Sequence, residues 1–146
     1  MDFADAVAIA ARVYGETRDR SGGLLLAHCI NVAQALGRAA TSTAMNAAVL
    51  HDVLEETQWT IEDLARWGVD PMVCEVVDGL TRQSGETYTD YLRRICDARG
   101  VAGDTARLVM VADLTVSAAR ADSDVLRERY EQSLPLVRSA LATADA

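Results

Sequence analysis

Aromatic residues are scarce in this sequence, at 5% of 146 residues, and no apolar run approaches the length that a membrane-spanning helix needs. Half of the residues are nevertheless apolar, and alanine, leucine, valine and arginine recur throughout, a mixture that favours helices over sheets. A chain of this length can form one domain with a substantial hydrophobic core, but it is too short for two domains that each have such a core. We therefore predict a single compact all-α domain over residues 1–146.

Positive charge is also scarce: the sequence has 14 basic and 22 acidic residues, so its formal net charge is −8. Nucleic acids and anionic membrane surfaces repel an acidic protein, so neither is expected as a general partner. A small anionic substrate would have to find a local basic pocket.

Cysteine is rare and widely spaced: Cys29, Cys74 and Cys96 include no CxxC pair. Neither a disulfide framework nor a cysteine zinc site is indicated, and buried free thiols are expected. The N-terminus carries Asp2 and Asp5 and lacks the basic region of a signal peptide. These features predict a reduced, cytoplasmic location.

Apolar spacing and end signals predict seven or eight helices joined by short loops, without repeats or long linkers. Thr60 with Asp63 approaches a capping box, and Asp70 with Pro71 starts a helix whose Met72, Val73, Val76 and Val77 are expected to face inward. Pro135 is expected to kink or break the last helix. The predicted ranges are 3–14, 24–36, 41–56, 60–68, a helix from 70, 89–98, 104–121 and a helix from 123.

Four ionisable residues interrupt an apolar run in AAVLHDVLEET, residues 47–57: His51, Asp52, Glu55 and Glu56. Neighbours on a helix point about 100° apart, so His51 and Asp52 can flank one ion, and the glutamates follow one turn later. A divalent ion usually needs more donors than these two residues offer, so the remaining ligands must come from elsewhere in the chain.

Two further donors lie in apolar surroundings. His28, the only other histidine, is in LLLAHCINVA, and Asp113 is in LVMVADLTV, where burial of an unpaired carboxylate would be costly. Each residue also has an ordinary structural alternative: a hydrogen-bonded core histidine, a cap or salt bridge for the aspartate, and solvated charges for the glutamates. Taken together, the histidines and aspartates on three helices predict a four-ligand metal site.

The order H…HD…D across successive helices resembles the HD superfamily of metal-dependent phosphohydrolases. HDVLEET, with AHCINVAQAL before it and VCEVVDGLTR after it, resembles more closely the hydrolase domain of the RelA/SpoT family and the small alarmone hydrolases. The resemblance extends from about Ala6 to Leu141. It implies an all-α HD-domain fold and an enzyme that removes the 3′-pyrophosphate from guanosine tetra- and pentaphosphate.

The resemblance also implies roles for individual residues. It makes His28, His51, Asp52 and Asp113 the ligands of one divalent ion, typically manganese. Glu55 and Glu56 match the acidic pair that positions or activates the attacking water, although the second is usually aspartate. The residues implied in substrate binding are Arg18, Arg20, Thr81, Arg82, Ser117, Arg127 and Tyr130.

Two departures from the family pattern flank Asp113. The family commonly has a lysine and an asparagine where this sequence has Met110 and Ser117. Cys29 also replaces the usual proline after the first histidine, and Asp19 takes one expected basic position. Two alternatives therefore stay open: an HD phosphohydrolase for another nucleotide or phosphate ester, and a helical domain that binds a nucleotide or partner protein without turnover. The oligomeric state is left open.

Overall fold

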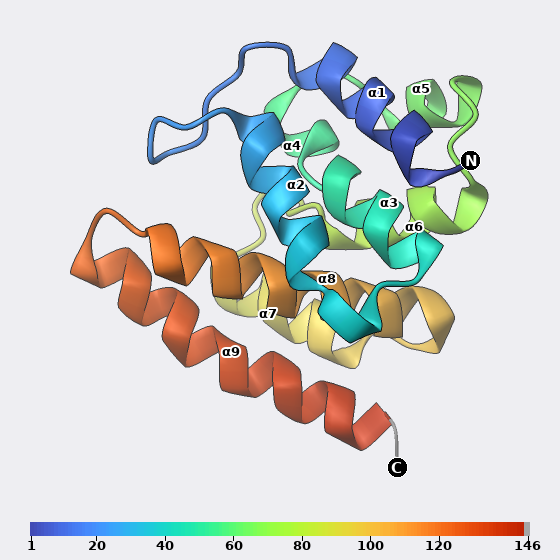
Figure 1. Ribbon diagram of the computed structural model, residues 1–146. Coiled ribbons are helices and arrows are strands. Elements are labelled where there is room, and N and C mark those ends of the chain that lie inside the picture. The colour runs from blue at the N-terminus through green and yellow to red at the C-terminus, as the bar shows by residue number, and fades with distance from the viewer. Residues whose placement is uncertain (145–146) are drawn as a thin grey trace.

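The computed structural model describes residues 1–144, and this part of the chain is entirely helical apart from its loops (Figure 1). The predicted all-α single domain is confirmed. The described residues form nine α-helices and one 3-10 helix: α1 (Phe3–Tyr14), α2 (Leu25–Ala35), η1 (Gly37–Ala39), α3 (Ser42–Leu50), α4 (Val53–Glu56), α5 (Ile61–Arg66), α6 (Pro71–Leu80), α7 (Tyr88–Asp97), α8 (Gly100–Arg120) and α9 (Asp124–Ala144).

Most helices begin where a side chain can cap them. The Asp2 side chain accepts a hydrogen bond from the Asp5 backbone at the start of α1, and Thr41 does the same for Ala44 at the start of α3. Thr60 and Asp63 form a complete capping box at α5, which confirms that sequence signal. The starting points of these helices therefore follow from hydrogen bonds made by nearby side chains.

The helix predicted over residues 41–56 is wrong as a single element. It stops at Leu50, turns through His51 and Asp52, and resumes as α4 at Val53. Asp52 has φ −96° and ψ 0°, which lies outside the helical region. Because of this break, the structure has one more helix than the eight ranges that the sequence predicts.

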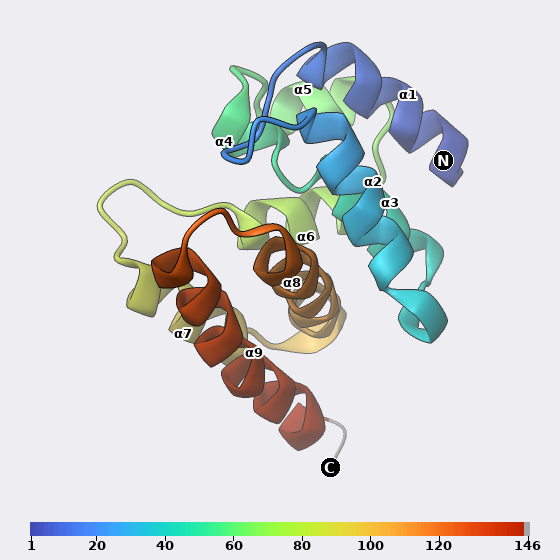
Figure 2. The same cartoon turned by 60° about the vertical axis from the view of Figure 1, so that its left-hand side comes forward.

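Helix α3 lies at the centre of the core. Its residues 46 to 50 are all buried, and it packs against α1, α2, α6 and α8. In Figure 2, α1 to α6 form the upper part of the molecule and α7 to α9 the lower part, with α8 between α9 and the upper part. His51, which directly follows α3, contacts Asp113 on α8 and therefore lies where these two parts meet.

Three details of the predicted helices need correction. Met72 is 36% exposed, because it points away from the face that buries Val73, Val76 and Val77. Of the predicted kink or break at Pro135, the break is absent, because α9 continues through this residue, with Ser133 and Val137 buried on either side of it.

Helix α8 also starts four residues earlier than predicted, at Gly100 instead of Asp104. Gly103 has a low helix propensity, but its missing side chain lets α8 pass close to the Ala98 backbone. A Cβ at Gly103 would lie 2.5 Å from the Ala98 carbonyl oxygen.

A buried arginine joins α7 to α8. Arg107 is 3% exposed, and its Nη1 donates to the carbonyl oxygens of Ile95, Cys96 and Ala98 at 3.1, 3.2 and 2.6 Å. Its Nη2 forms an ion pair with Asp104. Carbonyls at a helix end lack partners within the helix, so the guanidinium completes the end of α7.

We predict that Arg107→Leu lowers the free energy of unfolding by about 3 kcal/mol, because buried carbonyls lose a charged donor. Arg93→Leu is the matched control, since Arg93 is an exposed arginine of α7, and it should change stability by less than about 0.5 kcal/mol. Urea denaturation followed by circular dichroism measures both. Equal stability losses in the two variants would contradict the assignment.

Candidate metal centre and active-site cavity

The His51–Asp52 turn is held in place by Tyr14 at the end of α1. The buried Tyr14 hydroxyl donates to the Val49 carbonyl at 3.0 Å and accepts the Asp52 backbone N–H at 3.3 Å. The Cys29 thiol lies 3.7 Å from the same hydroxyl and 3.6 Å from Asp52 Oδ2. The break in the helix is therefore part of a packed, hydrogen-bonded arrangement.

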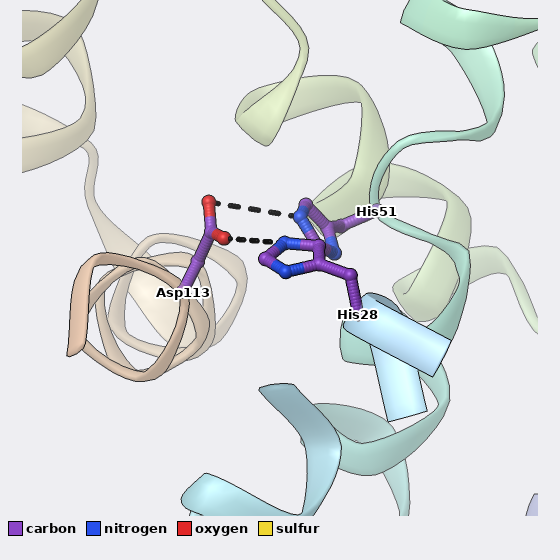
Figure 3. Close-up of side chains that lie close together, drawn as sticks. All are labelled: His28, His51 and Asp113. Carbon is purple, nitrogen blue, oxygen red and sulfur yellow. Dashed lines mark hydrogen bonds and ion pairs between the residues drawn. The ribbon is translucent and has the colours of Figure 1, made fainter. Parts of the chain in front are cut away.

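Three of the predicted metal ligands meet directly across the helices that carry them (Figure 3). His28 Nε2 on α2 lies 3.0 Å from Asp113 Oδ1 on α8, and His51 Nε2 lies 3.7 Å from Asp113 Oδ2. Asp52, the fourth predicted ligand, places Oδ2 3.4 Å from His51 Nε2. Residues that are 85 positions apart in the sequence are thus brought into contact.

These donors suit a divalent cation. His51 Nδ1 donates to the Ala48 carbonyl at 2.6 Å, which leaves Nε2 as the ligand atom, and this buried Nε2 has no hydrogen-bond partner among the described residues. Donor atoms of His28, His51 and Asp113 all lie within 4.8 Å of one another, as do those of Cys29, His51 and Asp52. A mixture of imidazole and carboxylate donors is typical of zinc, iron and manganese sites.

The charges of this cluster reinforce the same interpretation. Burial by itself would lower the pKa of His51, but the negative charges of Asp52 and Asp113, together with Cys29, raise it well above its ordinary value. Burial would raise the pKa of Asp113, yet His51 and His28 bring it far below the usual range. The cluster therefore strongly favours a positive charge between its carboxylates.

A cavity of about 480 Å³ opens beside these ligands, and only some of the predicted substrate residues line it. Arg18, Arg20, Arg82, Ser117 and Tyr130 do, and so do both glutamates, Glu55 and Glu56. The cavity walls also include Asp19, Ser21, Leu25, Tyr88, Tyr91, Arg120, Ala121, Asp122, Leu126 and Arg129. The cavity thus combines acidic groups near the ligands with several arginines.

Glu55 is oriented by the loop that follows α6. Its Oε1 accepts the Arg82 backbone N–H at 2.6 Å. Burial raises the pKa of Glu55, the Arg82 hydrogen bond opposes this rise, and the charge of Asp52 adds to it. A carboxylate with a raised pKa beside a metal centre is suited to exchanging a proton with water.

The loop carrying Arg82 is supported by residues that the sequence analysis missed. Arg94 donates to the carbonyls of Gly79 and Thr81 at 2.8 and 3.0 Å and pairs with Glu86 at 2.8 Å. The hydrogen bond with Arg94 lowers the pKa of Glu86 to about 2. Arg94 and Glu86 are thus positioning residues for the backbone that holds Glu55.

Asp19, the departure from the family's basic position, organises the loop between α1 and α2. Its Oδ1 accepts hydrogen bonds from the Ser21 and Gly23 backbones at 3.0 and 3.1 Å, and its Oδ2 pairs with Arg120 at 3.7 Å. Gly23 makes room for Arg120, since a Cβ there would lie 2.6 Å from its guanidinium. The acidic residue therefore ties this loop to the end of α8.

Three residues singled out by the sequence lie away from the cavity lining. Thr81 directs its hydroxyl to the Val77 carbonyl at 2.7 Å, and Arg127 pairs with Asp124 at 2.8 Å. Met110, which stands at the usual lysine position, is 3% exposed and belongs to the core. Ser117, at the usual asparagine position, lines the cavity and donates to Asp113 Oδ1 at 3.2 Å.

Comparison with known proteins agrees with this geometry. Residues 6–122 match the model of the family described as HD domain, so the chain belongs to the HD-domain family. The predicted membership of the HD superfamily of phosphohydrolases is thereby confirmed. No curated protein matches the chain.

Among solved structures, the fold is similar to that of a metazoan ortholog of SpoT, which is described as hydrolysing ppGpp and playing a role in starvation responses. The TM-score is 0.75 at 23% identity, over 95% of this chain and 84% of the other. At this identity the likeness shows the fold alone. Within the described residues, no helix is both long and apolar enough to cross a membrane.

We predict that the stability of the metal-free protein depends on the protonation of His51. Its pKa in the fold is raised above the ordinary value of 6.5, so its contribution is fully present below pH 6.5 and is lost as the pH rises through the folded-state pKa. The melting temperature in EDTA should therefore fall towards alkaline pH. Manganese should reduce this fall, because the cation replaces the proton.

His51→Gln is the control for this pH scan, since it has no imidazole to titrate. Its melting temperature should fall less steeply in EDTA over the same range. A curve identical to that of the unsubstituted protein would show that other groups cause the pH dependence.

A second prediction concerns Tyr14. Tyr14→Phe removes the acceptor for the Asp52 backbone N–H, so the dissociation constant for manganese should rise about tenfold while the metal-free protein stays folded. Tyr88→Phe is the control, because the Tyr88 hydroxyl pairs with Ser133 at 3.0 Å, away from the turn. Calorimetric titration measures both, and unchanged affinity in Tyr14→Phe would limit Tyr14 to a packing role.

Proposed function

We propose that the chain is a metal-dependent phosphohydrolase of the alarmone-hydrolase type, which removes the 3′-pyrophosphate from guanosine tetra- or pentaphosphate. One observation carries the proposal: the buried Nε2 of His51, which has no hydrogen bond within the described residues, lies close to the donor atoms of His28, Asp52 and Asp113 beside a cavity with glutamates and arginines. Membership of the HD-domain family supports the reaction class, and the quoted motifs support the substrate.

His28, His51, Asp52 and Asp113 would hold one divalent ion, for which we propose manganese. When bound, such an ion supplies Lewis acidity at a phosphate oxygen and favours deprotonation of water. The Cys29 thiol lies 3.6 Å from Asp52 Oδ2, next to this ligand set.

The protein's own residues then orient the reactants and move the proton. Glu55, fixed by the Arg82 N–H, accepts a proton as a water oxygen attacks phosphorus, and Glu56 extends the acidic face beside it. The new bond joins the water oxygen to phosphorus, the bond from phosphorus to the ribose 3′-oxygen breaks, and this oxygen takes up the proton from Glu55 to become a hydroxyl. Arginines lining the cavity offset the phosphate charge, which the net −8 protein would otherwise repel.

A second candidate is an HD phosphohydrolase that acts on another nucleotide or phosphate ester. Met110 favours this candidate, because an apolar core side chain takes the place of the lysine that the family commonly uses near the substrate. A small-molecule nucleotide is the proposed partner, and the cytoplasmic location stays a prediction.

The test is incubation of the chain with guanosine tetraphosphate and manganese, followed by anion-exchange separation of the products. We expect GDP and pyrophosphate. Glu55→Gln should lower kcat about 10²- to 10⁴-fold, the usual contribution of a general acid–base group. Glu62→Gln is the matched control, since Glu62 is an exposed glutamate outside the cavity, and it should keep the activity.

Failure to cleave the tetraphosphate, with turnover of another compound in a nucleotide panel, would favour the second candidate. Failure to bind a stoichiometric metal ion would contradict both. His51→Ala should abolish metal binding and turnover together.

A further inference from the structure

One arginine of the cavity comes from the C-terminal helix and is unexplained by the family pattern. Arg129 on α9 lies over the ring of Tyr88 on α7, with 4.7 Å between its guanidinium carbon and the ring centroid, and both residues line the cavity. This stacking fixes the position of the cation without using its N–H groups as hydrogen-bond donors. Tyr88 is itself anchored, because its hydroxyl pairs with Ser133 on α9.

The other cavity arginines are mostly engaged within the protein. Arg18 donates to the Gly22 carbonyl at 2.8 Å, Arg82 to the Glu86 carbonyl at 3.0 Å, and Arg120 pairs with Asp19 at 3.7 Å. Within the described residues, Arg129 and Arg20 are the lining arginines with neither a hydrogen bond nor an ion pair from the side chain. Their donors remain available to a ligand.

Arg129 comes from a helix that carries none of the four candidate metal ligands. Helix α9 packs on α8 and α7, and Figures 1 and 2 both show α8 between α9 and α4. Tyr88 also lines the cavity, and both charges act on it: burial raises its pKa, Arg129 lowers it and Asp113 raises it. The cavity thus has an acidic, metal-binding end and a separate cationic position on its α9 wall.

We propose that Arg129, held on Tyr88, binds a phosphate group of the substrate other than the one that is hydrolysed. This inference rests on the proposed function and specifies its substrate class as a nucleotide with phosphate at a position remote from the cleaved bond. The planar guanidinium offers paired N–H donors that match phosphate oxygens. Met110 on α8 is buried in the core and carries no charge, whereas Arg129 on α9 places a cation in the cavity lining.

The test is calorimetric titration of GDP and of guanosine into the full chain in EDTA. Without metal there is no turnover, so phosphate binding is measured apart from catalysis. Arg129→Gln should weaken GDP binding about tenfold, the usual loss for one charged hydrogen-bonding contact. Its affinity for guanosine, which lacks phosphate, should stay within about twofold of the unsubstituted chain.

Arg138→Gln is the matched control, because Arg138 is an exposed arginine of the same helix and lies outside the cavity. It should leave GDP binding unchanged. Equal GDP affinity in Arg129→Gln and the unsubstituted chain would overturn the proposal, as would equal losses in both arginine variants or no GDP binding at all. Failure to hydrolyse the tetraphosphate would overturn the proposed function but leave this binding result intact.

Discussion

The site depends on one break in a buried helix. If α3 continued as a regular helix through Asp52, the carboxylate would be placed by helical geometry alone, whereas the turn lets Asp52 approach His51 Nε2. A broken helix leaves backbone groups without partners in the protein interior, which is unfavourable unless something else bonds them. The Tyr14 hydroxyl meets this need at Asp52. The first helix therefore determines the geometry of a site that it does not line.

Charge distribution explains how an acidic protein can present a site for a phosphate compound. The net charge of −8 acts over the whole surface and is screened by salt, whereas cavity groups act at short range in a less polar medium. All 14 basic residues of the sequence are arginines. Their planar guanidinium groups can bond to carbonyls inside the fold, as Arg94 and Arg107 do, and also suit phosphate oxygens.

Much of this architecture could be predicted from the sequence, because caps and apolar spacing are local signals. The capping box at Thr60 and the Asp70–Pro71 start of α6 are both present. The sequence also singled out His28, His51, Asp52 and Asp113, which the fold brings together. The break after Leu50 was missed, since the apolar spacing continues across it and the hydroxyl that bonds the Asp52 backbone belongs to a tyrosine 38 residues away.

Residues that position the site were missed for the same reason. Glu86 and Arg94 are eight positions apart, and nothing local links them to a loop that orients Glu55. Arg129 and Arg127 are equally basic neighbours in the sequence, yet one lines the cavity and the other pairs with Asp124. Helical periodicity decides between them only once the packing of α9 on α7 is known. A motif can therefore identify candidate metal ligands, whereas residues that act through other groups emerge only from the tertiary fold.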